Sequence, residues 1–236
     1  MYNKTSIFNK FYVAVFSVSL VYFLLYTSFY FVCFFDKNGL YKLILANKTY
    51  EYLPFKLDME EIKLISSELM KYISSKLPFL ETKVTINGVL SDFYSVRSKI
   101  HMADVKNIIS NLTRINFIAI FFAILSGFRL INMPDFFKEV KKAYLRCLII
   151  VFFLLIVIFI IAIMNFDFFF TTFHEILFTN DLWLLDPNED YIICLLPEKI
   201  FMTYGIRIVI AMFVSITFVF FLLHILSKIQ SHQEAK

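Results

Sequence analysis

Uncharged apolar runs alternate with polar stretches along this chain. Three of the runs, 11–35, 147–166 and 208–227, are long enough to cross the hydrocarbon core of a membrane as helices, which takes about 20 residues. A fourth run, 115–128, is shorter and lies between Arg114 and Arg129. It becomes long enough when the residues before it are included and both arginines reach toward the membrane surface. The pattern therefore predicts four transmembrane helices.

The charges between these runs predict the orientation of the chain. Cations outnumber acids before the first run and between the second and third, and short loops rich in Lys and Arg stay in the cytoplasm. Both termini are therefore expected in the cytoplasm. The predicted parts are a tail with the first span (1–35), an extracellular cap (36–106), the second span (107–131), a basic cytoplasmic loop (132–146), the third span (147–166), an outer interfacial segment (167–197), the fourth span (198–228) and a cytoplasmic tail (229–236).

Residues 36–106 carry the signals of a folded segment. Asp58 and Glu61 have the spacing of a capping box ahead of a run of apolar residues with helical periodicity. Asn87-Gly88 lies between two short β-branched runs, which is typical of a tight hairpin. From about Ser98 a helical pattern resumes and leads into the second span. The expected fold is an α-helical integral membrane protein, with four transmembrane helices and a small α+β extracellular cap.

Composition and charge exclude several classes of protein. The chain is 59% hydrophobic with a mean hydropathy of +0.72, too apolar for an ordinary soluble domain. A net charge of +4 without a basic run argues against binding to nucleic acid. The three cysteines have no CxxC spacing and an odd count, so neither a disulfide framework nor a metal site is indicated.

Two of the four histidines, His101 and His174, are predicted to lie on the outer side at a similar depth. Imidazole is the side chain best suited to moving a proton near neutral pH. Asp104 shares a helix face with His101, so its carboxylate can orient that ring. The plainer interpretation is that both rings are interfacial and bonded to backbone. No motif for a serine or cysteine nucleophile accompanies them.

Several short stretches have a family resemblance. Residues 173–187 read FHEILFTNDLWLLDP, residues 195–201 read LLPEKIF, and residues 101–106 read HMADVK with Ser95 and Arg97 ahead of them. These stretches, and the order of spans and histidines, resemble the lipoprotein intramolecular transacylases of Gram-positive bacteria. The resemblance covers most of the chain in layout and a smaller part of it in motif.

The resemblance implies an acyl shift within one substrate. The partner would be a diacylated bacterial lipoprotein whose sn-2 acyl chain moves from glycerol to the α-amino group of its N-terminal cysteine, giving the lyso-form. An ester becomes an amide, so the reaction runs downhill and needs no cofactor or metal. The substrate's own amine is the nucleophile. We expect a monomer in contact with membrane lipid in the bacterial cell membrane, with its active site on the outer face.

The same resemblance suggests roles for individual residues. One histidine would deprotonate the amine, and the other would protonate the departing oxygen or stabilise the oxyanion. We favour His174 as the base, but the reverse assignment stays open. The supporting residues would be Arg97 and Asn180 as oxyanion donors, Asp104, Asp181 and Asp186 as orienting acids, Trp183 as a pocket wall, and Glu198 at the start of the fourth span.

Two other functions are compatible with a polytopic membrane protein. A non-catalytic sensor or assembly protein would bind a partner through its cap, and it predicts that His101 and His174 lie far apart. A small transporter would need a polar path through the bilayer, yet the predicted spans contain almost no ionisable residue. We rank the transporter last.

Overall fold

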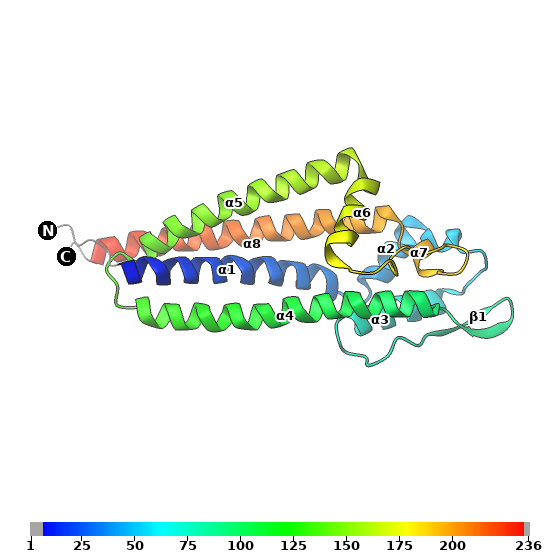
Figure 1. Cartoon of the computed structure of the whole chain (residues 1–236). Coiled ribbons are helices and arrows are strands. Elements are labelled where there is room, and N and C mark those ends of the chain that lie inside the picture. The colour runs from blue at the N-terminus through cyan, green and yellow to red at the C-terminus, as the bar shows by residue number, and fades with distance from the viewer. Residues whose placement is uncertain (1–6, 234–236) are drawn as a thin grey trace. The chain divides into compact units, whose positions relative to one another are not determined.

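The computed structural model describes residues 7–233, most of which are helical (Figure 1). The elements in chain order are α1 (Ile7–Phe34), α2 (Gly39–Asn47), the 3-10 helix η1 (Thr49–Tyr52), α3 (Met59–Ile73), β1 (Lys83–Ile86), β2 (Val89–Asp92), α4 (Val96–Leu130), α5 (Phe136–Met164), α6 (Phe166–Leu177), α7 (Ile192–Leu195) and α8 (Glu198–Gln233). The β-structure of these residues is a single two-stranded sheet.

Four of the helices are long and apolar enough to cross a membrane. They are α1, α4, α5 and α8, and each covers one of the four predicted runs. The prediction of four membrane-spanning helices is therefore confirmed. Helix α4 also explains the short second run, because it begins at Val96 and continues without a break to Leu130. The helical pattern read from Ser98 onward belongs to this same helix.

The chain divides into two units, and the four long helices contribute to both. The first, here called the bundle unit, holds the described residues up to Phe29, then Thr113–Ile161 and the residues from Val209 onward. The second, here called the mixed unit, holds Tyr30–Leu112 and Ala162–Ile208, and contains the sheet and all the short helices. His101 and His174 both belong to the mixed unit.

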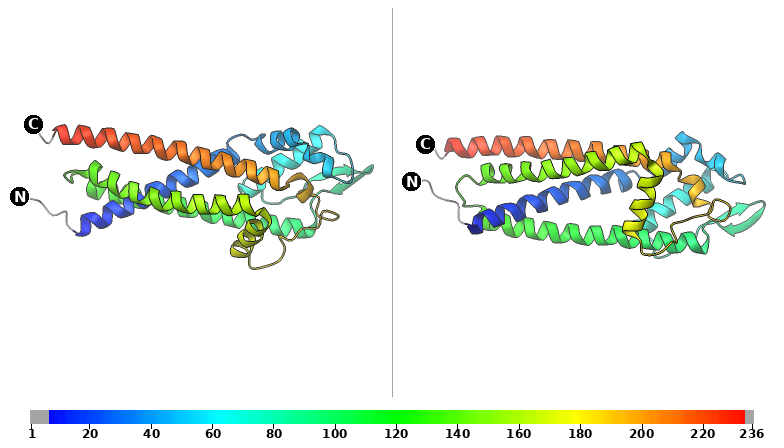
Figure 2. Two further views of the ribbon diagram at one scale, coloured as in Figure 1. Left: turned by 90° about the horizontal axis from the view of Figure 1, so that it is seen from above. Right: turned by 45° about the horizontal axis from the view of Figure 1, so that its top comes forward.

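The bundle unit has a small buried core made by α1, α4, α5 and α8. Tyr144 is fully buried in this core and donates its hydroxyl to the carbonyl of Ile216, 2.9 Å away. Much of the remaining apolar surface is exposed, as expected for helices that face lipid. Helix α1 begins, and α8 ends, at the end of this unit that carries the α4–α5 connection (Figure 2).

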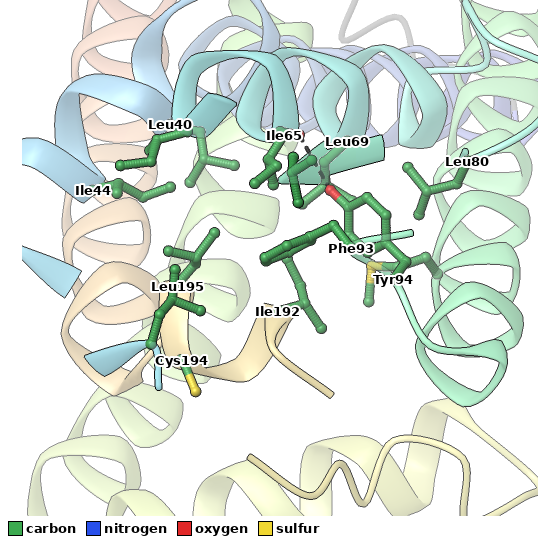
Figure 3. Close-up of a cluster of buried hydrophobic side chains, with 14 of the residues drawn as sticks. Leu40, Ile44, Ile65, Leu69, Leu80, Phe93, Tyr94, Ile192, Cys194 and Leu195 are labelled. Atoms are coloured by element: carbon green, nitrogen blue, oxygen red, sulfur yellow. Dashed lines mark hydrogen bonds between the residues drawn. The ribbon is translucent and has the colours of Figure 1, made fainter. Parts of the chain in front are cut away.

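The mixed unit has a core of its own, to which segments far apart in sequence contribute. Helix α3 buries Ile65 and Leu69 against Phe93 and Tyr94, which follow β2, and Ile192 in α7 completes this part of the cluster (Figure 3). The Tyr94 hydroxyl donates to the carbonyl of Ile65 at 3.2 Å. This core joins the residues before α4, the helix that carries His101, to the residues before α8.

The predicted capping box begins α3. The Asp58 carboxylate accepts a hydrogen bond from the backbone N–H of Glu61 at 2.7 Å, and Glu61 accepts one from the N–H of Asp58 at 3.1 Å. Both bonds satisfy N–H groups that the first turn of a helix leaves without partners.

Replacing Asp58 with alanine removes one of these bonds and should destabilise the protein by about 1 kcal/mol. For a chain of this size we expect the thermal midpoint in detergent to fall by about 2–4 °C. Glu60→Gln is the matched control, because Glu60 is exposed in the same turn and its salt bridge to Lys63 is long, at 3.5 Å. Equal midpoints for the two variants would contradict the role given to the cap.

The predicted hairpin is also confirmed. Strands β1 and β2 pair antiparallel, with Ile86 opposite Val89, so Asn87 and Gly88 make the turn. Both turn residues have positive φ, 51° and 84°. Asn and Gly are the residues that adopt this conformation most readily, which is why this dipeptide marks a two-residue turn.

Candidate active site

Helix α6 carries His174 in its last turn. The helix begins at Phe166 because Asn165 has an extended backbone and its side chain accepts a hydrogen bond from the N–H of Phe168 at 3.0 Å. It ends where the N–H of Phe178 bonds the carbonyl of His174 at 2.8 Å. The C-terminal end of a helix favours positive charge, so this position can stabilise an imidazolium.

Helix α4 carries His101 near its N-terminal end. Ser95 caps this end, since its hydroxyl accepts a hydrogen bond from the N–H of Ser98 at 3.0 Å. The His101 side chain is only 5% exposed and that of His174 only 8%. The two rings lie side by side, with centroids 6.0 Å apart and planes at 36°. The structure therefore brings together the two histidines singled out from the sequence.

Aromatic side chains surround the two imidazoles. Trp183 stacks on His174 with ring centroids 4.8 Å apart, and Phe170 lies against the same ring at 4.0 Å. Phe178 contacts both histidines, at 5.0 Å from His101 and 5.6 Å from His174. Such surroundings exclude water, and exclusion of water strengthens any hydrogen bond or charge interaction formed within the site.

The hydrogen bond of His174 defines where its proton lies. Its Nδ1 is 2.6 Å from the carbonyl oxygen of Phe170, one turn earlier in α6. A carbonyl oxygen can only accept a hydrogen bond, so Nδ1 carries the hydrogen. In the neutral ring Nε2 then has a free lone pair. His174 is thus held in the tautomer in which Nε2 can accept a proton.

His101 is in a different situation. Its Nδ1 is buried and has no hydrogen-bond partner within residues 7–233. A buried N–H without an acceptor is rarer than an acceptor without a donor, so the neutral ring with its hydrogen on Nε2 is favoured. That tautomer presents an N–H donor. The two imidazoles therefore have complementary roles available to them, a base at His174 and a donor at His101.

Asp104 and Asn180 form a polar contact beside the histidines. The side-chain amide of Asn180 donates to Asp104 at 3.0 Å, and its oxygen accepts from the N–H of Leu182 at 3.0 Å. Asp104 lies one turn after His101 on α4, and its charge acts favourably on a protonated His101. This pair joins α4 to the segment that follows α6.

Arg97 and Asp186 also hold the segment that follows α6 in place. The Arg97 guanidinium donates to two backbone carbonyls, that of Leu184 at 3.0 Å and that of Asp181. The side chain of Asp181 is exposed, whereas its carbonyl holds the arginine. The Asp186 carboxylate accepts from the N–H and the side chain of Asn188, both at 2.9 Å, and so closes a turn at Asp186-Pro187-Asn188.

Glu198 belongs to a different part of the mixed unit from the two imidazoles. Helix α8 begins at this residue, as expected, and Glu198 is exposed. It lines a cavity of about 370 Å³ together with Asn47, Thr49, Tyr52, Pro197, Lys199 and Met202. None of the residues that surround the two imidazoles lines this cavity.

Sequence reasoning did not single out three residues of this site. Phe170 and Phe178 lie four residues before and after His174, so helical spacing places them on its face and would have identified them. Asp190 accepts a hydrogen bond from the hydroxyl of Ser95 and is 1% exposed. Its burial has no signal in the sequence, because it follows three other polar positions in a turn.

Trp183 is the single tryptophan of the chain, so its fluorescence reports on the stack with His174. Burial lowers the pKa of His174 below its ordinary value, against the opposing effect of its bond to Phe170. A protonated imidazole quenches indole emission by electron transfer far better than a neutral one does. Emission should therefore stay constant as pH falls through the ordinary imidazole range, about 6.5, and decrease only below it.

The check is a pH titration of tryptophan emission in detergent. His174→Phe should remove the decrease, because it keeps an aromatic ring beside Trp183 but has no titrating group. A decrease centred at or above the ordinary imidazole pKa, or one that persists in His174→Phe, would contradict the assignment.

The fold is similar to that of solved membrane proteins. The lipoprotein intramolecular transacylase Lit from Bacillus cereus has a structure that matches with a TM-score of 0.71 at 22% identity, over 97% of this chain and 98% of that one. Two variants of that protein, with a histidine replaced by arginine or by alanine, match with TM-scores of 0.69 and 0.68, both at 23% identity. They cover 97% of this chain, and 94% and 96% of theirs. At this identity the likeness establishes the fold.

The sequence itself assigns the family. No curated protein matches it. The family profile described as lipoprotein intramolecular transacylase Lit matches residues 14–201, a range that includes α4, α6 and both histidines. The predicted resemblance is therefore confirmed. A multi-pass helical membrane protein with this profile over most of its length belongs to the lipoprotein intramolecular transacylase family Lit.

Proposed function

We propose that this chain moves the sn-2 acyl chain of a diacylglyceryl lipoprotein to the α-amino group of its N-terminal cysteine. In this reaction the amine nitrogen attacks the ester carbonyl carbon and forms a tetrahedral intermediate. The bond from that carbon to the glycerol oxygen then breaks. The oxygen takes up a proton, and the product is an N-acylated lyso-form with a free glycerol hydroxyl. Both reacting groups belong to one molecule, so no acyl-enzyme forms.

The observation that carries this proposal is the hydrogen bond from Nδ1 of His174 to the carbonyl of Phe170. It leaves Nε2 as the nitrogen that removes a proton from the attacking amine. The imidazolium that results is stabilised by the end of α6 and by the same carbonyl. The Phe170 carbonyl has the orienting role that a carboxylate has in a serine protease triad.

His101 supplies the complementary donor. Its ring centroid is 6.0 Å from that of His174, so both imidazoles can reach the same substrate group. The Nε2–H of His101 hydrogen-bonds the oxyanion, and its proton passes to the glycerol oxygen as the bond to carbon breaks. The proton that His174 removed from the amine then restores the N–H of His101, so both rings end the cycle neutral. Burial and the charge of His174 lower the pKa of His101 to about 4, and Asp104, one turn further along α4, partly opposes this shift.

The surrounding aromatic rings orient the substrate and exclude water from the site. The amine must reach the ester through a medium-sized ring, so most chain conformations are unproductive. Fixing the productive one can contribute several kcal/mol toward the barrier, up to about 7–11 in well-oriented systems. Water in the site would hydrolyse the ester instead. Trp183 and Phe178 lie against the His174 ring and cover part of it from water.

The test is the N-terminal chemistry of a lipoprotein from a host with and without this chain. Transfer within one molecule leaves the mass of the lipopeptide unchanged, but its α-amine stops reacting with amine reagents. Fragmentation should place one acyl group on the cysteine nitrogen. A rise in mass by one acyl group would instead mean transfer from a separate lipid, and a fall would mean hydrolysis. Either result would reject the proposed reaction.

We also propose that the termini lie in the cytoplasm and the active site on the outer face. Helix α1 begins and α8 ends at one end of the bundle unit, together with the basic connection between α4 and α5. This arrangement supports the orientation that the positive-inside rule predicts. Labelling of cysteines introduced at Asn87 and at Asp135 by an impermeant reagent tests it. Only the cysteine in the hairpin turn should react in intact cells.

The non-catalytic alternative receives no support from these contacts. A sensor or assembly protein predicts two histidines that lie far apart, whereas the rings are 6.0 Å apart and share Phe178 as a neighbour. Production of lyso-form lipoprotein by the wild-type chain would exclude this alternative directly.

A further inference from the structure

Asp190 is the only buried carboxylate within residues 7–233, with 1% of its side chain exposed. A carboxylate is costly to bury unless hydrogen bonds replace the water that it loses. Asp190 has two such bonds. Its Oδ1 accepts from the Ser95 hydroxyl, and its Oδ2 accepts from the backbone N–H of Asp186 at 2.9 Å. The cost of burying this carboxylate indicates that the turn geometry held by Asp190 contributes to the function of the protein.

The two bonds join α4 to residues 178–191, here called the connecting segment, which link α6 to α7. Ser95 caps α4, the helix that carries His101. Asp186 follows Trp183, which stacks on His174. Asp190 therefore bonds Ser95, at the start of the helix that carries His101. It also bonds Asp186, which is close in sequence to Trp183, the residue that stacks on His174.

Two further polar contacts hold the connecting segment to α4, and both involve groups that solvent can reach. Arg97 is exposed where it bonds the carbonyls of Asp181 and Leu184, and Asn180, which bonds Asp104, is partly exposed. Water competes with exposed and partly exposed bonds much better than with buried ones. The bond between Ser95 and Asp190 is itself part-buried, but its acceptor is 1% exposed. It is therefore the polar contact best placed to hold the segment while substrate enters and leaves.

We propose that Asp190, through Ser95, is a positioning residue that holds Trp183 over His174 and so keeps the pair of imidazoles dry and aligned. The proposal deepens the function proposed above, since it concerns the same site. Asp190 itself touches neither imidazole in any described contact. Its effect passes through the connecting segment.

The first test compares Asp190→Asn with Glu189→Gln in the full-length protein. Glu189 is the adjacent acid, and it is exposed. An asparagine at 190 can accept only one of the two bonds, so the connecting segment loosens. We expect kcat for lyso-form formation to fall by about 10- to 100-fold with little change in KM, because orientation is lost and binding is not. Glu189→Gln should behave like the wild type.

The second readout needs no substrate, so it separates a failure of this proposal from a failure of the proposed function. His101 is the titratable group that faces His174, and Asp104 lies beside His101. If Asp190→Asn lets water reach His174, the midpoint of Trp183 quenching should move to higher pH. The emission maximum should also shift to the red. A purely structural role would lower the melting temperature and leave both spectral measurements unchanged.

Variants at Ser95 keep the proposal testable if Asp190→Asn does not fold. Ser95→Ala removes the donor and the cap, whereas Ser95→Thr retains the hydroxyl that serves both. We expect Ser95→Ala to reproduce the spectral shifts and Ser95→Thr to restore the wild-type midpoint. An unchanged quenching midpoint and emission maximum in both Asp190→Asn and Ser95→Ala would overturn the proposal, whatever happens to activity.

Discussion

Replacement of His174 by alanine should lower lyso-form formation by about 10²- to 10⁴-fold, the usual contribution of a positioned proton-transfer group. In the proposed mechanism the neutral ring offers Nε2 to the substrate amine, because the Phe170 carbonyl holds the other nitrogen. Alanine removes the base and leaves the amine to lose its proton to solvent, which the aromatic rings largely exclude. The measurement is the fraction of lipoprotein whose N-terminal amine is blocked, at matched protein level.

Two further variants sharpen this test. His224→Ala is the matched control, since His224 is in the bundle unit and no role in the site is assigned to it. His174→Gln keeps a side chain of similar length that can still bond Phe170 but cannot accept a proton from an amine. It should be as inactive as alanine. Substantial activity in His174→Gln would mean that this side chain only fills space or donates a hydrogen bond.

Replacement of His101 by alanine should cause a loss of the same order, because the oxyanion loses its donor and the glycerol oxygen its acid. Glutamine at this position places an N–H near that of Nε2 but cannot give up a proton. If His101 serves chiefly as an oxyanion donor, His101→Gln should recover part of the activity that alanine loses. If it serves chiefly as an acid, both variants should be equally inactive.

The His101 variants have two controls: a substitution elsewhere in α4 and the emission of the single tryptophan. Asn107→Ala changes an exposed polar residue of α4 and should retain activity. In His101→Ala the single tryptophan should still be quenched at low pH, because the stack on His174 does not depend on His101. If the two histidines act on one transition state, as proposed, the double variant should lose much less than the product of the single losses. Multiplicative losses would show that they act independently.

The parts of the fold that the sequence predicts are those decided by local pattern. The length of an uncharged run predicts a membrane span whatever packs beside it, and Asn87-Gly88 requires the positive φ that a tight hairpin turn needs. The capping box of α3 depends on two residues three positions apart. Helix α6 was not predicted, because its many phenylalanines resemble an interfacial stretch and its N-terminal signal is a single residue, Asn165.

The candidate site likewise has features that the sequence predicts and features that it does not. That His101 and His174 approach the same level follows from counting residues along helices, each adding about 1.5 Å. That their rings are neighbours, and that Trp183 covers one of them, depends on how the connecting segment packs. The sequence predicts residue types for that segment but not their contacts. The sequence predicts Arg97 and Asn180 as oxyanion donors but not the bonds that the structure gives them, which run to protein carbonyls and to Asp104.

The bond from His174 to the carbonyl four residues earlier has a consequence for how this chemistry can be inherited and altered. A base whose tautomer is set by the backbone of its own helix needs no dedicated third side chain, and no substitution can delete its partner. Neighbouring acids are then free to vary between relatives and to tune the rate by degrees. Substitution of Asp104 or Asp186 should therefore reduce activity in part and not abolish it. The smallest set of groups that the proposed reaction needs is then one helical turn that carries a histidine, and a second imidazole.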